Sequence, residues 1–565
     1  MFKLTDRTGV RRLPVPPVQD LLAIFAIGGG AVLMTLLNRS GEAAPGQYSI
    51  FERLFFFNDY AGSLAMLIGV VLALQVEAIQ TGAMRLAEWI GMHPRTTCAL
   101  AFVAMAAGAR FVYMAHPLSM DEYVPVMQAN AFAHGELVAH YPVPLLDEIV
   151  WEPFRGSFIL LNTSTGDAVS GYWPGLAVLM TPFVVVHAPW ALNAALSTLA
   201  LALIGEFAAH AGRDESGADS RRGWAMLAAL ASPVFTINAM SFYAMPGLLA
   251  LNLLFLWLLL RPGHLAAFLA GLVGGVALVL HNPVPHALMA VPCLVWMAAD
   301  RTRRARLPAL IAGYLPPALL LGVGWPLFTS SLHMAREMSS KVHEGFVADW
   351  LQRIGKIFHL PSADTLEARQ YATWKIWIWA CPGLALAPFV VRPRDAALKL
   401  MFAALLLTYF FYFLVPFDQG HGWGYRYIHP AWGVIPIAGG LWFAREGPAR
   451  SLGAIVVAAG LLATPVFLWK THETITGFLA LRIQPPADGR WVVFVDTSPR
   501  YSNDLVQNPP GNDRVLNLIS QGDAKDRLLM ARQFPQAVQV VHDARGSSWR
   551  LSAPARSASG SAGTS

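Results

Sequence analysis

Asp121 and Glu122 are the residues of this chain whose types and position best suit chemistry. They stand side by side directly after an apolar run, residues 97–115, that is long enough to cross a membrane. An ionised carboxylate at the rim of a membrane can accept a proton from a hydroxyl or an amine, or hold a divalent metal ion. An acid at a helix start can equally be a simple N-cap. The pair alone therefore leaves a catalytic and a structural interpretation open.

The composition indicates which elements must position this pair. Apolar residues make up 55% of the 565 residues and charged residues only 13%, and the apolar residues fall in blocks that match a hydrocarbon layer of about 30 Å. We expect an all-α polytopic membrane protein. Its spans, about thirteen, are predicted at residues 21–37, 62–79, 98–114, 190–210, 224–240, 243–260, 265–280, 284–299, 307–328, 373–391, 400–415, 428–443 and 452–469.

Basic residues orient these spans, because Lys and Arg in short loops stay on the cytoplasmic side. Lys3, Arg7, Arg11 and Arg12 put the N-terminus in the cytoplasm of an inner (plasma) membrane protein. Loops 115–172 and 329–371, and everything after residue 470, then lie outside. Counting residues 173–186 as a span would invert the later loops, so we interpret them as a half-span beside a cavity, since irregular backbone at membrane depth needs such cover.

Several classes of function find no support in the sequence. The net charge of +6 reflects the cytoplasmic loops and is no argument for nucleic acid. The three cysteines, Cys98, Cys293 and Cys381, lie in or beside apolar spans and suit core packing, with neither a disulfide framework nor a metal site among them. No phosphate-cradling G-x-x-x-x-G-K-[ST] motif occurs.

The loop at residues 115–172 is strongly acidic, with Arg155 as its one Lys or Arg. Residues 121–134 predict a short amphipathic helix lying along the membrane surface, with Val124, Met127 and Ala131 on its apolar side. Asp121 would then lie near the helix N-terminus, where the dipole favours the ionised form.

The order of motifs resembles a known class. An apolar span is followed by M-D-E-Y-V-P-V-M-Q-A-N-A-F-A-H-G-E-L from residue 120, the acidic loop, G-Y-W-P-G at residues 171–175 and many spans. This order is similar to the membrane-embedded GT-C glycosyltransferases, the class of the protein O-mannosyltransferases and the bacterial aminoarabinose transferases. The likeness covers residues 98–469. The sequence differs from the family pattern in two ways. Two extra spans precede residue 98, and Trp173 replaces a proline of the family's Y-P-P-G-like element.

The resemblance implies an extracytoplasmic glycosyltransferase that takes a single sugar from a polyprenyl-phosphate carrier and passes it to a lipid, glycan or protein acceptor. Asp121 and its neighbour Glu122 match the family's catalytic or metal-binding acid. The mechanism that fits is an in-line displacement with inversion, in which Asp121 acts as the general base.

A phosphate donor requires a cation at the outer surface. Arg336 and Lys341 in loop 329–371 are candidates, although five positions apart they would not share one helix face closely. Arg426 is the stronger candidate, because the family's Gly-x-Arg-Tyr…Pro stretch falls on Gly424, Arg426, Tyr427 and Pro430, and an Arg fork matches phosphate. An ordinary aromatic belt with a snorkelling arginine is the alternative.

Tyr172, Trp173, His281 and Tyr427 are expected to line the substrate cavity. His281 lies where two spans meet on the outer side and could complete a metal site, although a polar helix connection explains it as well. A divalent metal ion is thus an open alternative, with no ligand set assigned.

The composition changes after residue 470. Residues 491–496, 514–519 and 537–542 predict strands and residues 523–533 a helix. The predicted domains are therefore a cytoplasmic stub with two extra spans (1–97), the membrane domain (98–470), a small extracytoplasmic α/β domain (471–554) and a disordered tail (555–565).

Other functions remain open at this stage. A multi-span transporter would use broken helices and acids to couple ions, but the acids here gather in an outer loop and no internal duplication is visible. A polysaccharide polymerase or ligase of the cell envelope, or a membrane scaffold, are further alternatives.

Overall fold

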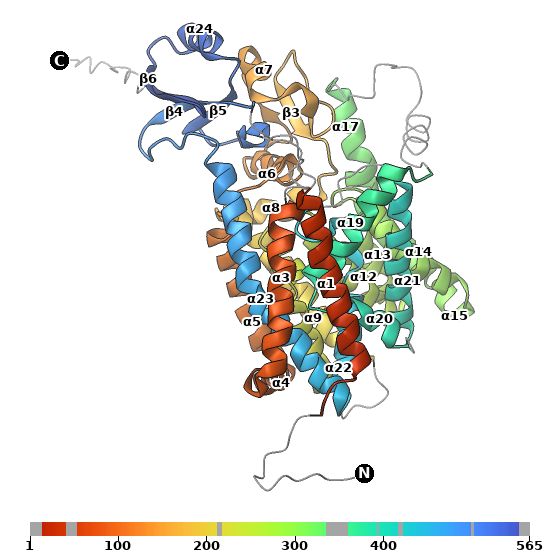
Figure 1. Ribbon diagram of the computed structural model, residues 1–565. Coiled ribbons are helices and arrows are strands. Elements are labelled where there is room, and N and C mark those ends of the chain that lie inside the picture. Colours follow the sequence, from red (N-terminus) through yellow and green to blue (C-terminus); the bar gives the residue numbers. More distant parts are fainter. Residues whose placement is uncertain are drawn as a thin grey trace, which may run out of the picture.

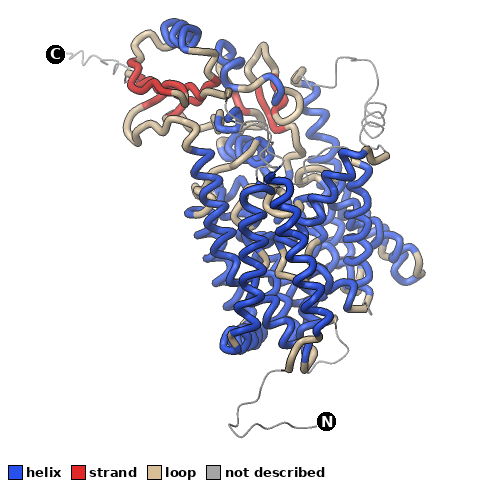
Figure 2. Tube along the Cα trace, viewed as in Figure 1, coloured by secondary structure: helices blue, strands red, loops and turns tan. Residues whose placement is uncertain are grey.

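The structure is a computed structural model that describes residues 14–40, 54–211, 217–334, 360–392, 395–415, 422–498 and 502–552. Most of these residues are helical, and the long helices run roughly parallel to form one elongated bundle (Figures 1 and 2). The strands gather at one end of the bundle, and helix α4 lies at the other.

The bundle consists of the following helices and helical turns: α1 (Val18–Ser40), η1 (Leu54–Asp59), α3 (Tyr60–Gln75), α4 (Glu77–Met92), α5 (Pro94–Phe111), α8 (Gly175–Val185), η4 (Pro189–Ala191), α9 (Leu192–His210), α10 (Ala218–Leu230), α11 (Pro233–Asn238), α12 (Met245–Leu260), α13 (His264–Leu278), α14 (Val284–Ala298), α15 (Arg301–Arg304), α16 (Leu307–Pro317), η6 (Ala318–Gly324), α17 (Trp325–Ser331), α19 (Ala363–Trp379), η7 (Leu384–Leu386), α20 (Ala387–Val390), α21 (Ala396–Phe411), η8 (Tyr412–Leu414), η9 (Arg426–Ala431), α22 (Val434–Phe443) and α23 (Pro448–Leu479).

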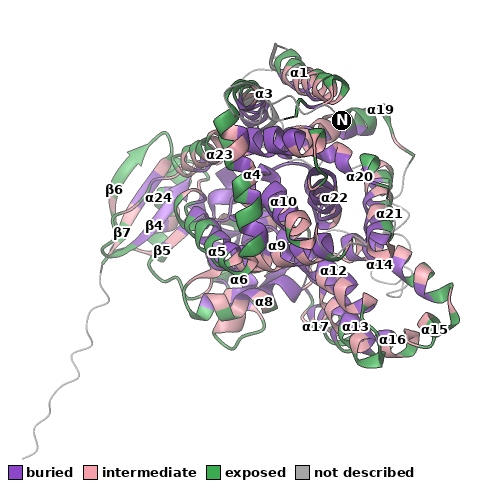
Figure 3. Ribbon diagram, turned by 90° about the horizontal axis from the view of Figure 1, so that it is seen from below, coloured by how far each residue is buried: buried purple, intermediate pink, exposed green. Residues whose placement is uncertain are grey.

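Burial along the bundle is that of a multi-pass membrane protein. Viewed along the bundle, buried residues gather on inner helices such as α10 and α22, whereas α1, α15 and α16 on the outside carry many exposed ones (Figure 3). The exposed residues include large apolar side chains such as Leu22, Leu265 and Leu320. Apolar surface on so many outer helices would be unfavourable in water and suits lipid.

The number of membrane crossings stays a prediction. By length and composition, five helical stretches of the described chain could each cross a membrane, and α3 with α4, bent by 100°, makes up to six. Several predicted spans are interrupted, because proline ends or bends a helix. Residues 224–240, for example, form α10 and α11 with a break before Pro233, and residues 428–443 begin with the 3-10 turn η9 around Pro430.

Residues 173–186 contain the short helix α8, as a half-span requires. Its 11 residues span about 17 Å at 1.5 Å per residue, roughly half of the hydrocarbon layer. The start of α8 docks on the end of α13, where the Gly175 and Leu176 N–H groups donate to the Val279 and Leu280 carbonyls. A Cβ at Gly175 would lie 2.5 Å from the Val279 oxygen, so only glycine permits this approach.

Helix α6 (Met120–Ala133) follows α5 and carries the acid pair. The prediction that it is amphipathic is wrong, because most of its residues are buried, including polar Glu122 and Gln128. Its placement along the membrane surface stays a prediction. The helix is buried because the C-terminal region and the loop after α6 pack over it. That loop forms the helical turns η2 (Val143–Leu145), α7 (Leu146–Ile149) and η3 (Glu152–Phe154), and an antiparallel sheet β1-β3-β2 of β1 (Ala139–His140), β2 (Ile159–Leu161) and β3 (Asp167–Ser170).

The C-terminal region is the predicted α/β unit. It comprises β4 (Arg490–Val495), η10 (Ser502–Leu505), β5 (Val515–Ile519), α24 (Asp523–Gln533), β6 (Val538–Asp543) and β7 (Gly546–Leu551). The sheet order is β5-β4-β7-β6, with β4 and β5 parallel and the other pairs antiparallel. Its apolar face shares one buried cluster with α6, in which Val124 and Met127 meet Val492 and Phe494. The predicted tail lies outside the described residues.

Candidate active site

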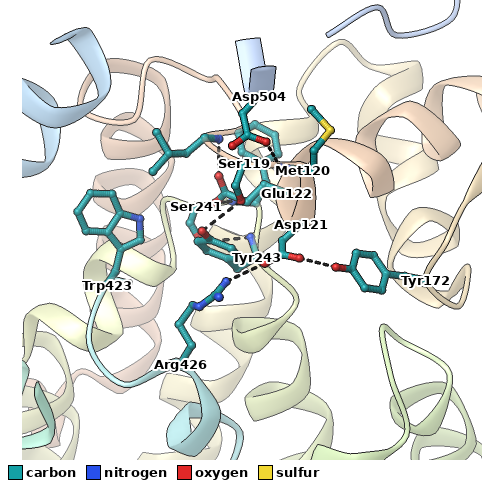
Figure 4. A network of polar contacts seen from close by, with 12 residues as sticks. Ser119, Met120, Asp121, Glu122, Tyr172, Ser241, Tyr243, Trp423, Arg426 and Asp504 are labelled. Atoms are coloured by element: carbon teal, nitrogen blue, oxygen red, sulfur yellow. Dashed lines mark hydrogen bonds and ion pairs between the residues drawn. The ribbon is translucent and has the colours of Figure 1, made fainter. Parts of the chain in front are cut away.

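The Asp121 side chain is the point at which three distant parts of the chain meet. Tyr172 donates its hydroxyl to Asp121 Oδ1, and Arg426 Nη1 lies 3.1 Å from Asp121 Oδ2 (Figure 4). The N-cap position of α6 is Ser119, and Asp121 stands in the first turn. Asp121 is therefore no N-cap, and its carboxylate is directed at groups from outside its own helix.

The environment of Asp121 holds it in the ionised form. Burial alone would raise the pKa of its carboxyl, but the charge of Arg426, the proximity of His281 and the hydrogen bonds from Tyr172 and Arg426 outweigh burial and lower that pKa. The side chain keeps 16% of its surface exposed. The carboxylate is thus charged, and its side chain is not fully buried.

Arg426 reaches Asp121 from the turn η9, and its guanidinium carbon also lies 4.7 Å from the centre of the Tyr243 ring. Only 2% of the side chain is exposed. The loop before it turns at Gly422 and Gly424, whose φ values of 140° and 82° suit glycine. Tyr427 stacks on Tyr412 at a ring distance of 4.0 Å. These contacts hold a permanent cation at the carboxylate.

Tyr172 and His281 pack against each other beside Asp121. Their ring centres are 3.8 Å apart, and burial lowers the pKa of His281 to about 4, the nearby Asp121 and Arg426 acting in opposite senses. His281 is therefore neutral near pH 7. Trp173, by contrast, donates its indole N–H to the Gly322 carbonyl at 3.1 Å. Its side chain thus fastens the start of α8 to η6.

Glu122 has a different environment from its neighbour. It is fully buried, and its two oxygens accept from the Tyr113 hydroxyl at 2.8 Å, the Leu118 N–H at 2.5 Å and the Phe242 N–H at 3.1 Å. The Tyr113 hydroxyl in turn accepts from the Trp423 indole at 2.9 Å. Glu122 therefore ties α6 to α5 and to the loop that carries Arg426, which favours a positioning role over the predicted catalytic one.

Other predicted site residues have different outcomes. Arg336 and Lys341 lie outside the described residues. Within the described ranges, no group of three or more His, Cys, Asp and Glu side chains is arranged to hold a metal ion.

Sequence reasoning missed several residues that the fold brings to the site. Tyr243 comes from the loop before α12, where its hydroxyl lies 3.3 Å from that of Ser119, and Asp504 comes from the C-terminal region, where it accepts from the Met120 N–H at 3.1 Å (Figure 4). Neither residue stands in a motif. An unusually polar stretch at 502–508 is the only local signal for Asp504.

Comparisons with known proteins returned similarity at the level of structure only. No protein-family model and no curated protein matches the sequence. The similar solved structures include ArnT from Cupriavidus metallidurans bound to undecaprenyl phosphate and the same protein in the apo state. The first is 13% identical with a TM-score of 0.48, over 80% of this chain and 97% of that one. The second is 14% identical with a TM-score of 0.45, over 81% and 98%.

Proposed function

We propose that this protein is a membrane-embedded glycosyltransferase that moves one sugar from a polyprenyl-phosphate carrier to an acceptor on the extracytoplasmic face. The observation that carries the proposal is the Asp121–Arg426 pair, because it places an ionised carboxylate and a buried guanidinium 3.1 Å apart. The carboxylate can accept the proton of an acceptor group, and the guanidinium can bind the phosphate of a donor. The order of the sequence motifs supports the same class.

The reaction needs one bond to form and one to break at the anomeric carbon. The acceptor hydroxyl or amine attacks this carbon and loses its proton to Asp121, while the bond to the phosphate oxygen breaks and the electron pair leaves with the lipid phosphate. Arg426 offsets the charge that develops on that phosphate. Attack opposite the leaving group inverts the configuration of the sugar.

Donor binding would also prepare the base. In the structure Arg426 lowers the pKa of Asp121 and so weakens it as a base. A donor phosphate that draws the guanidinium away would raise the pKa of Asp121 towards its ordinary value. Asp121 would then become a better proton acceptor only when a sugar donor is present. Without a donor, it would remain a weak base.

A groove between α19 and α21 suits the isoprenoid tail. It has a volume of about 390 Å³ and is lined by Leu366, Gln370, Thr373, Trp374, Trp377, Tyr409 and Phe413. The next turn after α21, η8, supplies Tyr412, which stacks on Tyr427 beside Arg426. A lipid in this groove could therefore extend its phosphate towards the site.

Two variants separate the proposed roles. Asp121→Asn removes the base, and we expect it to abolish transfer while a polyprenyl-phosphate sugar still co-purifies. Arg426→Gln removes the phosphate partner, and we expect it to lose the lipid as well. Native mass spectrometry of the protein extracted from its own membranes measures the bound lipid, and transfer of a labelled sugar measures activity.

Trp173→Phe is a matched control, because it alters a half-buried aromatic residue beside the site while leaving the charges unchanged. The proposal is wrong if the wild-type protein neither retains nor binds added polyprenyl phosphate, or if Asp121→Asn keeps full transfer activity.

A further inference from the structure

The C-terminal region sends one segment, residues 502–508, into the active site. All seven residues are buried although five of them are polar: Ser502, Asn503, Asp504, Gln507 and Asn508. Burying polar side chains is unfavourable unless each finds partners. The hydrogen-bond partners of these side chains show which part of the chain the segment holds in place.

The segment is bonded to both ends of the loop that starts α6. Gln507 Nε2 donates to the Pro117 carbonyl at 2.9 Å, and Asp504 Oδ1 accepts from the Met120 N–H at 3.1 Å. Further along, the Asn508 N–H donates to the Tyr123 hydroxyl at 2.8 Å. These three bonds hold the Pro117 carbonyl and the Met120 N–H before Asp121 and the Tyr123 side chain after it.

A helix leaves its first N–H groups without partners inside the helix, and a side-chain oxygen must satisfy them. The N-cap residue of α6, Ser119, makes no capping bond with its own side chain. Asp504 takes over part of this role from a position 384 residues away in the sequence. The next residue after the capped one is Asp121.

We propose that Asp504 is a positioning residue of the active site, through which the C-terminal region fixes the first turn of α6 and so the direction of the Asp121 carboxylate. This inference rests on the proposed function, since it assigns Asp121 the role of base. It makes the C-terminal region part of the catalytic unit.

The electrostatics agree with such a role. Burial raises the pKa of Asp504 to about 8, and Asp121 and Glu122 on α6 add to the rise, whereas the Met120 N–H opposes it. Arg482 after α23 also contacts the segment and donates to the Leu505 carbonyl. The Asp504 carboxyl is therefore mostly neutral at pH 7, and an amide of the same shape can replace it as an acceptor.

The test compares Asp504→Leu with Asp504→Asn in the full-length protein. Leucine cannot accept from Met120, so we expect kcat to fall about 10- to 100-fold, the loss typical of a small misplacement of a catalytic group, with KM for the lipid donor changed less than about threefold. Asparagine keeps an acceptor oxygen, and we expect it to restore kcat to within about threefold of wild type.

Hydrogen–deuterium exchange provides a readout independent of activity. In Asp504→Leu, peptides covering residues 118–126 should exchange faster than in wild type. Asp526→Leu is the matched control: Asp526 is a buried acid of the same region, but its partners are Ser520 and Gln521. It should leave exchange at 118–126 and kcat unchanged.

Each outcome decides the inference. Unchanged exchange at 118–126 in Asp504→Leu overturns it, as does an equal loss of kcat in the asparagine variant or in Asp526→Leu. If Asp504→Leu does not fold, Gln507→Met, which removes the bonds from Gln507 to the Pro117 and Asp504 carbonyls, should give the same changes in smaller size. A wild-type protein that transfers no lipid-linked sugar would refute the proposed function, while the exchange data would still decide the role of Asp504.

Discussion

Asp121 and Glu122 are neighbours in the sequence, but their environments push their pKa values apart. Arg426 and the hydrogen-bond donors around Asp121 lower its pKa. Burial raises the pKa of Glu122 to about 7, against the hydrogen bonds of Leu118, Tyr113 and Phe242. A pair of acids separated in this way suits one base and one structural residue.

The raised pKa of Glu122 predicts how stability depends on pH. Its ordinary pKa is 4.5 and its folded value about 7, so between these values the folded state holds a proton that the unfolded state has lost. The contribution of Glu122 to the free energy of unfolding therefore falls by on the order of 3 kcal/mol as pH rises from about 4.5 to 7. Above pH 7 this contribution no longer changes with pH. Glu122→Gln should remove this part of the decline.

Thermal unfolding of the purified protein in micelles, followed by tryptophan fluorescence from pH 5 to 8, measures the effect. The difference in Tm between wild type and Glu122→Gln should shift in favour of the variant as pH rises. A constant difference across this range would show that Glu122 does not titrate there. Glu136→Gln, a change at an exposed acid of the same loop, is the control.

At the scale of elements, a buried ion pair joins the N-terminal helices to the loop that carries Arg426. Lys375 on α19 lies 2.5 Å from Asp59 at the start of α3, and both side chains have 0% exposure. Lys375 also donates to the Gly422 carbonyl at 3.2 Å, and Trp379 donates to Asp59 at 2.5 Å. The helices before residue 98, which lie outside the family-like region, are thereby coupled to the site.

Lys375→Met should destabilise the protein by about 3–5 kcal/mol, because Asp59 stays buried without its ammonium partner. The double variant with Asp59→Leu should regain most of this stability, since an apolar pair of similar size often replaces a buried ion pair at little cost. Its kcat should stay reduced, because the Gly422 carbonyl still lacks Lys375. Thermal unfolding and sugar transfer measure the two effects. Equal stability of the single and double variants would contradict the coupling.

At the scale of the whole molecule, the α/β region and helix α4 lie at opposite ends of the bundle (Figure 1). The positive-inside rule predicts that the region after residue 470 is extracytoplasmic and that the loop at residues 301–306 is cytoplasmic. The opposite arrangement would place the site, which adjoins the α/β region, in the cytoplasm, where nucleotide sugars occur.

Cysteine labelling tests this orientation. Asp488→Cys and Arg301→Cys each replace an exposed residue. In spheroplasts, a membrane-impermeant maleimide should label the first variant and spare the second until the membrane is opened. The unaltered chain, with its three native cysteines, measures the background. Labelling of Arg301→Cys alone would reverse the topology and exclude a donor site on the outer face.

Local patterns predicted much of the fold. The helix at Asp523–Gln533 is found at its predicted bounds, and β4 and β5 lie within one residue of theirs. Strand β7 was missed, because its residues, Gly546–Leu551, show no regular apolar alternation. Breaks inside apolar runs, such as the one before Pro233, were also missed. Hydropathy averages over a window, whereas one proline acts on a single turn.

The sequence by itself determined that the chain belongs in a membrane, that an acid pair follows an apolar run and that Arg426 stands among aromatic residues, because each of these features is contiguous. Only the tertiary structure decided that Arg426 lies against Asp121 across 305 residues, that Glu122 is sequestered and that Asp504 caps α6. Such pairings depend on how the helices pack and on which loops cover α6. No single segment contains that information, so it exists only once the whole chain has folded.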